Sequence, residues 1–168
     1  MNYYESVVFD YLRADRTVFL NTEYCIQINP GDNPDTSGPH WYCDAVALKF
    51  QAEEVKIFLV EISYAKNLAG LIKRLKDWND NWEGVCAALV RDSAFPYSFA
   101  TSWSMRPWLF VPEHLVCLLK ERLVQIANGQ PLKFDYEITP LEKVVPWLFP
   151  AHNRKPDCDH LGPLDELH

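Results

Sequence analysis

Two apolar segments decide the fold, HWYCDAVALKF at residues 40–50 and KIFLVEISY at residues 56–64. Both are rich in β-branched and aromatic residues, which is typical of β-strands. The second segment is apolar almost without interruption, so it predicts a central strand buried on both faces. Only residues 51–55 separate the two segments, and residues 51–54 are expected to form a polar turn, so we expect neighbouring strands. Each strand carries one carboxylate, Asp44 in the first and Glu61 near the end of the second.

Side chains alternate between the two faces of a strand, and this alternation predicts which residues of the first segment share a face. One face is expected to carry Trp41, Cys43, Ala45 and Ala47. The other face is expected to carry Tyr42, Asp44, Val46 and Leu48. The pattern therefore places the carboxylate of Asp44 among apolar neighbours.

Helical periodicity marks the segments that flank these strands. A helix is predicted over residues 3–14, and the clearest helix over residues 67–82. The apolar stripe of the second helix consists of Leu68, Leu71, Ile72, Leu75, Trp78 and Trp82. Gly84 is expected to end this helix. The short apolar run VCAALV at residues 85–90 then predicts a buried strand that lies parallel to a neighbour.

The remaining segments continue this mixture of strands and helices. Strands are predicted at residues 17–28 (with a break at Asn21), 106–111 and 133–138, helices at 113–128 and 140–148, and loops at 29–39 and 93–104. The first three strands favour a meander, and the helix after them crosses over to a further strand. We therefore predict one α/β domain over residues 1–150, with a mixed central sheet flanked by helices, and a polar C-terminal tail over residues 151–168.

Composition and charge limit the classes of function. The chain has 168 residues, of which 48% are hydrophobic and 23% charged, as expected for a folded domain. Its formal net charge of -7 argues against a nucleic-acid-binding protein that relies on a wide basic surface. An acidic protein still binds phosphates where a metal ion or a local cluster of Lys and Arg supplies positive charge.

Cysteine usage and the N-terminal sequence predict a cytoplasmic protein. The five cysteines are odd in number and show no C-x-x-C spacing, so we expect reduced thiols rather than a disulfide framework or a zinc ribbon. The first residues include acids and lack the basic region of a signal peptide. No apolar run is long enough to cross a bilayer, so no membrane association is expected.

Asp44 and Glu61 are the residues that most need an explanation. A carboxylate in a buried strand is strongly unfavourable unless a cation or hydrogen-bond donors compensate for the lost water. On neighbouring strands the two acids can lie near one end of the sheet and share a Mg²⁺ (or Mn²⁺) ion, since such hard cations prefer carboxylate oxygens. An ion of this kind activates water and stabilises charge that develops on a phosphate.

The predicted order of helix, three strands, helix and strand over residues 3–90 resembles the PD-(D/E)XK nuclease superfamily, the restriction-endonuclease-like fold. In that family an Asp on the second strand precedes an E-x-K triplet on the third. Asp44 matches the Asp, and the EIS sequence at residues 61–63 falls on the triplet. The sequence departs from the pattern at two positions: Cys43 stands where the family has Pro, and Ser63 replaces the triplet Lys.

The resemblance implies a three-layer α/β sandwich and metal-dependent cleavage of phosphodiester bonds in DNA or RNA. It also implies the metal ligands, which are the carboxylates of Asp44 and Glu61 and the main-chain carbonyl of Ile62. In members of the family the triplet Lys positions or activates the attacking water.

The replacement of that Lys by Ser63 removes a positive charge from the implied site. Lys66, just past the strand, or Lys73, on the following helix, would take its place as the phosphate or water contact, since the family is known to relocate this residue. Glu5 on the first helix is a further candidate acid, as in some members of the family.

The two buried acids also have a purely structural interpretation. Asp44 would then accept hydrogen bonds from backbone N–H groups and brace the long preceding loop. Glu61 would form a structural ion pair with Lys66 or Lys73. The sequence leaves the metal site and the structural interpretation open.

Two further candidates carry the chemistry of metal ligands. His40 lies at the start of the strand that contains Asp44, although a His at a strand end is commonly a surface residue. The C-terminal segment contains His152, Asp157, Cys158, Asp159, His160 and His168. Their spacing matches no structural metal site, so a polar surface tail is expected there.

Two more segments are candidates for contacts with a partner. The densest basic group consists of Lys66, Lys73, Arg74 and Lys76. It either tracks a phosphate backbone or forms a solvated helix face. The aromatic segment at residues 95–108 contains Phe95, Tyr97, Phe99, Trp103 and Trp108. These side chains either stack on bases, bind a protein partner, or pack in the core.

These observations support two functions from different classes. The first is a nuclease-like protein that hydrolyses DNA or RNA with Mg²⁺, which both buried acids favour. The second is a catalytically inactive module of the same fold that binds a protein or nucleic-acid partner as an inhibitor or regulatory subunit, which the missing Lys and the acidic charge favour. A small-molecule binder that uses the aromatic loop is a third possibility. The sequence leaves the oligomeric state open.

Overall fold

Four α-helices and five strands make up the part of the chain that the computed structural model describes, residues 3–29, 39–51, 54–92 and 103–145. Their order is α1 (Tyr3–Ala14), β1 (Val18–Gln27), β2 (His40–Gln51), β3 (Glu54–Ile62), α2 (Ala69–Asp80), α3 (Trp82–Asp92), β4 (Ser104–Val111), α5 (Val116–Ala127) and β5 (Glu137–Pro140). Two short 3-10 helices, η1 (Glu113–Leu115) and η2 (Leu141–Lys143), follow β4 and β5.

The strands form one mixed sheet in the order β1-β2-β3-β4-β5. β1, β2 and β3 form an antiparallel meander, and β3, β4 and β5 run parallel to one another. Helical crossovers join the parallel strands, with α2 and α3 before β4 and α5 before β5. β3 pairs on both sides and is buried over residues 57–61. The prediction of a central strand buried on both faces is confirmed.

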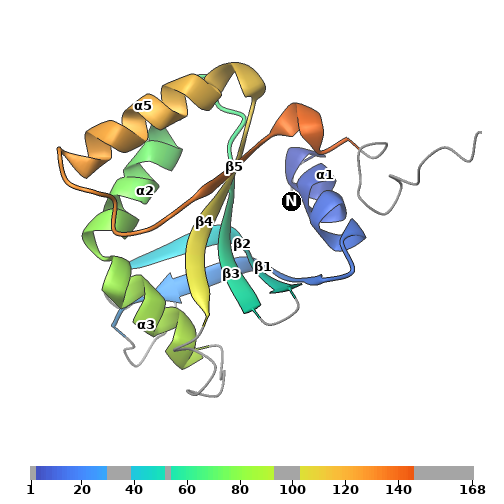
Figure 1. Ribbon diagram of the computed structural model, residues 1–168, viewed down its shortest axis with the longest axis horizontal. Helices are drawn as coiled ribbons and strands as arrows, with labels where there is room; N and C mark the ends of the chain where they lie inside the picture. The colour runs from blue at the N-terminus through green and yellow to red at the C-terminus, as the bar shows by residue number, and fades with distance from the viewer. Residues whose placement is uncertain (1–2, 30–38, 52–53, 93–102, 146–168) are drawn as a thin grey trace, which may run out of the picture.

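Helices cover both faces of this sheet (Figure 1). α1 packs on one face, in a cluster that includes Val8, Phe9, Leu12, Phe58, Val60, Trp108 and Phe110. The other three helices pack on the opposite face, in a larger cluster that includes Leu59, Leu75, Trp78, Leu89, Leu109 and Leu119. The predicted α/β architecture, a mixed sheet flanked by helices, is therefore observed.

Residues 85–90 are the largest departure from the sequence prediction, because they form a helix and not a strand. They belong to α3, whose buried residues Trp82, Val85, Ala88 and Leu89 recur at helical spacing. A short apolar run cannot distinguish a buried strand from a buried helix by periodicity alone. Gly84 lies inside α3 rather than at the end of the preceding helix, α2, which ends at Asp80. The strand parallel to β3 is β4 instead.

Other elements are found where they were expected, with shifted ends. β1 continues through Asn21 without the predicted break. β5 is shorter than the strand predicted at residues 133–138 and begins later. Of the helix predicted at residues 140–148, the described part contains only η2. The tail at residues 151–168 and most of both predicted loops lie outside the described residues.

β1 and β2 change the face that their apolar side chains occupy, which breaks the predicted alternation. Leu20 packs in the cluster beneath α1, whereas Ile26 packs in the cluster beneath the other three helices. On β2, Cys43 and Ala45 likewise belong to opposite clusters. Glu23 lies at the change of face and has a positive φ of 56°, a backbone conformation that twists a strand away from regular alternation. The prediction that Cys43 and Ala45 share a face is therefore wrong.

The described cysteines are free thiols. Cys43 is buried, Cys25 and Cys86 are half-buried, and Cys117 is exposed. Burial raises the pKa of Cys43 well above its usual value and raises the pKa of Cys86 to about 11. Both thiols are therefore protonated at neutral pH and are poor nucleophiles or metal ligands.

None of the described helices combines the length and the apolar character that a membrane span requires.

Candidate functional site

Three carboxylates lie in a row across β1, β2 and β3. Glu23 falls opposite Asp44 in the register of β1 with β2. The pairing of β2 with β3 begins at Ala45 and Val60, so Asp44 and Glu61 are the residues just beyond the paired stretch. Like charges at opposed positions destabilise a sheet unless something compensates for them. The row of acids therefore requires positive charge or hydrogen-bond donors nearby.

Glu61 obtains one such partner from the helix that follows it. Its side chain is 3% exposed, and its Oε2 accepts a hydrogen bond of 2.5 Å from Nη1 of Arg74 in α2. The other oxygen, Oε1, is buried and has no hydrogen-bond partner among the described residues. Since a buried carboxylate oxygen without a partner is costly, this atom is the least satisfied part of the site.

Asp44 obtains its partner from the backbone of the neighbouring strand. Its Oδ2 accepts a hydrogen bond of 2.6 Å from the main-chain N–H of Ile62. Asp44 on β2 is thus hydrogen-bonded to the residue that follows Glu61, at the end of β3. The structural interpretation predicted a backbone donor for Asp44, and the donor is on β3 rather than in the preceding loop.

Burial controls the protonation of both acids. Burial raises the pKa of Glu61 to about 8, although the charge of Arg74 opposes this rise. Burial also raises the pKa of Asp44, against the hydrogen bond from Ile62 and the charge of Arg74, while the Glu5 carboxylate raises it further. One guanidinium is therefore too little positive charge for the pair, and a proton or a second cation would relieve the deficit.

A hollow of about 470 Å³ opens beside the acid pair. Its lining comes from α1, the meander and α2, and consists of Glu5, Phe9, Glu23, Tyr42, Cys43, Asp44 and Arg74. The predicted extra acid, Glu5, therefore faces the same space as Asp44. Three carboxylates and one guanidinium line the hollow, so the lining has a net negative charge.

Arg74 has a role that the sequence did not predict for it, since it was expected only as a member of the basic group with Lys66, Lys73 and Lys76. The structure pairs Glu61 with Arg74, whereas the structural interpretation predicted Lys66 or Lys73. Lys66 is exposed in the turn after β3, and Lys73 lines a separate groove between α2 and α5. The helical spacing could have predicted this pairing. Arg74 lies three residues after Leu71, so both residues are on the face of the helix that packs on the sheet.

The other candidates lie away from the acid pair or outside the described residues. His40 is exposed at the start of β2, with its ring 6.0 Å from that of Tyr42. Trp108 is buried, and its Nε1 donates to Thr139, so it belongs to the core. Trp103 packs against the larger core cluster. The other aromatic candidates of the 95–108 segment and the metal-ligand types of the C-terminal tail are not described.

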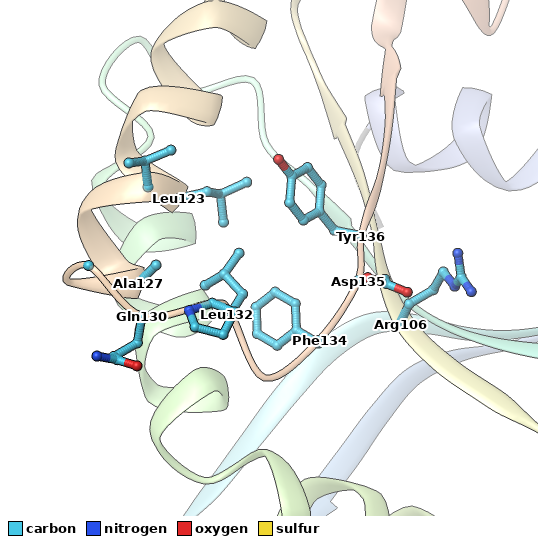
Figure 2. A pocket seen from close by; sticks show the side chains of 11 residues that line it. Arg106, Leu123, Ala127, Gln130, Leu132, Phe134, Asp135 and Tyr136 are labelled. Carbon is cyan, nitrogen blue, oxygen red and sulfur yellow. The ribbon is translucent and has the colours of Figure 1, made fainter.

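A second hollow of about 580 Å³ lies between α5 and the segment that leads to β5. Figure 2 shows Leu123, Leu132 and Phe134 turned toward this space. Arg106 of β4 also lines this hollow, and its Nη1 lies 3.9 Å from Oε1 of Glu137. The lining mixes apolar side chains with polar ones, and Asp135 is its only acid, so this hollow is a weaker candidate for chemistry than the acid pair.

The donor set at the acid pair fits a hard divalent cation. Asp44 and Glu61 supply carboxylate oxygens, one of which is buried without a partner among the described residues. Ile62, whose carbonyl the resemblance implies as a ligand, is held beside Asp44 by its N–H. Oxygen donors of this kind suit Mg²⁺ or Mn²⁺ better than softer metals. The described residues contain no group of three or more His, Cys, Asp or Glu side chains arranged around one point, so water or substrate oxygens would complete the coordination.

In comparisons with known proteins, no protein-family model, curated protein or solved structure matches the chain.

Proposed function

We propose that this chain is a nuclease-like protein that hydrolyses phosphodiester bonds of DNA or RNA with Mg²⁺ or Mn²⁺ held between Asp44 and Glu61. The observation that carries the proposal is the juxtaposition of these two acids on neighbouring strands, beside Arg74, with one Glu61 oxygen unpartnered among the described residues. A divalent cation would satisfy that oxygen and balance the negative charge of the hollow.

The arrangement of the elements supports the same proposal. From α1 to β4 the chain forms a helix, an antiparallel meander of three strands, a helical crossover and a strand parallel to the third. The sequence resembles the PD-(D/E)XK superfamily in the same order of elements, with Asp44 on the second strand and Glu61 on the third. The strand that completes the order is β4 and not residues 85–90, which are helical. The restriction-endonuclease-like fold is part of the proposal.

Each residue of the site would have a distinct role. Asp44, Glu61 and the Ile62 carbonyl would hold the cation, which when bound supplies an activated water and stabilises charge on the phosphate. Arg74 lines the hollow as a permanent positive charge and would bind the substrate phosphate. A guanidinium has no acceptor and stays protonated, so Arg74 would position the phosphate rather than remove a proton from water.

Cleavage assays with single-stranded and duplex DNA and RNA test this function. With Mg²⁺ or Mn²⁺ the wild-type chain should cut at least one of these substrates, and EDTA should stop the cutting. Asp44→Asn and Glu61→Gln should each lower the rate by about 100-fold or more, because each removes a charged ligand of the cation.

Glu54→Gln is the matched control for these variants. Glu54 is an exposed acid at the other end of β3, so the same change in side chain there should leave the rate unaltered. Cutting by Asp44→Asn at the wild-type rate would refute the proposal and would point to a contaminating nuclease.

A second candidate function is a catalytically inactive module of the same fold that binds a partner. Two observations favour it: Ser63 stands in place of the triplet Lys, and the cation at the site is Arg74, which cannot act as a base. On this alternative the acid pair and Arg74 are a structural remnant, and binding relies on other surfaces.

Restoring the triplet separates the two functions. If the chain is inactive because it lacks the Lys, the wild type should cut nothing and Ser63→Lys should gain Mg²⁺-dependent cutting. If the wild type cuts and Ser63→Lys cuts no faster, the result would instead favour the active form. If neither chain cuts any substrate, both the active form and the explanation from the lost Lys are wrong.

A further inference from the structure

Three exposed tyrosines form a cluster at the start of α1 and just past the end of β3. Tyr3 is 76% exposed, Tyr4 is 44% exposed and Tyr64 is 48% exposed. The rings of Tyr4 and Tyr64 are stacked, with centroids 4.7 Å apart and planes inclined by 24°. The ring of Tyr3 meets that of Tyr4 edge to face at 5.6 Å. Contact between the three exposed rings makes them one contiguous aromatic patch, and such patches mark candidate binding surfaces.

The cluster borders a hollow of about 320 Å³ that is separate from the acidic one. The hollow lies between the start of α1, the end of β3 and η2, which Figure 1 shows beside α1. Apart from the tyrosines its lining is mainly aliphatic: Val7, Pro112, Leu141, Glu142, Val144 and Val145. A volume near 300 Å³ is at the lower end for small-molecule sites, so the hollow matches one ring-sized group rather than a large ligand.

The tyrosine cluster and the acid pair are adjacent along two elements. The first turn of α1 contributes Tyr4 to the apolar hollow and Glu5 to the acidic one. At the end of β3, Tyr64 follows Glu61 by three residues. A polymer that places a phosphate at the acid pair would therefore bring a neighbouring residue to the tyrosines.

The chemistry of the cluster fits a nucleobase better than a phosphate. Every base has a π-face that stacks on an aromatic ring, while the described lining of the hollow contains no Lys or Arg and includes the acid Glu142. The chain also has a formal charge of -7, so long-range attraction to a phosphate backbone is weak. A base inside a duplex is stacked on its neighbours and cannot offer its face to a side chain.

We propose that Tyr3, Tyr4 and Tyr64 form a stacking subsite for an unpaired nucleobase, so that the substrate class is single-stranded nucleic acid. This inference deepens the proposed function, because it names the form of DNA or RNA that reaches Asp44 and Glu61. It also predicts binding without any metal, since stacking requires none.

Fluorescence anisotropy with two labelled strands in EDTA tests the subsite. One strand is a ten-nucleotide oligothymidylate, and the other is an abasic decamer with the same number of phosphates. The wild-type chain should bind the oligothymidylate about 10-fold to 100-fold more tightly, because stacking contributes that much per base. Tyr64→Ala and Tyr4→Ala should lose most of this preference, and Tyr64→Phe should keep it because the ring remains.

Phe19→Ala is the matched control. Phe19 is 63% exposed on β1, where it contacts Phe50 rather than the tyrosines, so its loss should leave the preference intact. Tyr3→Ala is a second test variant that is expected to fold normally. It removes the most exposed ring of the cluster, and an exposed side chain contributes little to stability. A partial loss of preference in a Tyr3→Ala chain with an unchanged melting temperature supports the subsite.

Three results would overturn the proposal. The first is equal affinity of the wild type for the two strands. The second is an equal loss of the preference for oligothymidylate in Phe19→Ala and Tyr64→Ala. The third is a dimer that Tyr64→Ala dissociates in sedimentation, which would make the cluster an interface between two copies of the chain. Because the assay contains no metal, loss of the base preference disproves the subsite alone, whereas absence of cleavage with the preference intact disproves only the hydrolytic function.

Discussion

Glu61 is almost fully removed from water, and Arg74 is the partner that the structure gives it. Moving both charges out of water costs free energy, which their mutual attraction only partly returns. The raised pKa of Glu61 shows that the cost of burial exceeds the attraction of Arg74. At the scale of single residues, the site is therefore strained in its charged form and would gain from a second positive charge.

Glu61→Gln should remove a pH dependence of folding stability. The acid titrates near 4.5 in the unfolded chain and at about 8 in the folded one. Between these values the folded state holds the extra proton, so the free energy of unfolding should fall as pH rises, by at most about 1.4 kcal/mol per pH unit. Urea titrations in EDTA from pH 5 to pH 8 should show this slope in the wild type and a flatter one in the variant. Identical slopes would mean that another group titrates.

Arg74→Leu should destabilise the protein in a pH-dependent manner. At pH 9 the wild-type Glu61 is largely charged and paired with Arg74, whereas in the variant burial keeps Glu61 protonated, so the variant should lose about 1 kcal/mol more unfolding free energy than at pH 5. At pH 5 Glu61 is protonated in both chains, so this pH-dependent loss should be absent. Lys76→Leu, which removes the exposed ion pair with Asp80 on the same helix, serves as the control and should show little change at either pH. A loss at pH 5 as large as that at pH 9 would contradict the explanation.

At the scale of elements, long periodic segments were predictable and short ones were not. The helix predicted at residues 3–14 coincides with α1, because twelve residues show a complete amphipathic pattern. The six residues of VCAALV contain too few turns for a pattern, and their place in α3 depends on packing against the sheet. The interior position of Gly84 in α3 follows from the same packing.

Gly84→Ala tests the helical assignment of this segment. Inside a helix the substitution should gain about 1 kcal/mol, but a Cβ at this position would lie 3.3 Å from Cδ1 of Ile28. The gain should therefore be small in the wild type and larger in an Ile28→Val chain, which lacks that atom. Urea denaturation of the four chains of this double-mutant cycle measures the difference. Equal effects of Gly84→Ala in both backgrounds would show that Ile28 does not restrict the position.

At the scale of the whole molecule, the sheet and the two helix layers bring distant segments to one hollow. α1 supplies Glu5, β2 supplies Asp44, and α2 supplies Arg74. The hollow lies at one end of the antiparallel meander, where α1 and α2 approach from opposite faces of the sheet. A cation bound there would connect strands and helices, and its effect should be visible in global stability.

Mg²⁺ should therefore raise the melting temperature of the wild-type chain. At ten times the dissociation constant, the ion stabilises the folded state by about 1.4 kcal/mol, which for a chain of this size is a shift of roughly 3–6 °C. Asp44→Asn should lose the shift, and Glu54→Gln should keep it. A rise of equal size in Asp44→Asn would place the bound ion elsewhere on the molecule.

Much of the candidate site was predictable, because its two buried acids are visible in the sequence as charged residues among apolar ones. Asp44 and Glu61 stand out as charges within apolar strands, and the meander that makes them neighbours follows from the short turn between their strands. The choice of Arg74 over Lys66 and Lys73 was not predictable in the same way. It depends on the rotation of α2 about its axis, which the packing of Leu75 and Trp78 into the core determines.

The sequence by itself determined the strands of the meander, the helices with a full apolar stripe and the two acids that lie in buried strands, since these features rest on local periodicity. Only the tertiary structure decided that residues 85–90 are helical, that Asp44 binds the backbone of Ile62, and that Tyr4 stacks on Tyr64. The physical reason is that strand register and helix rotation are set by packing between residues far apart in the chain, and no local pattern records them.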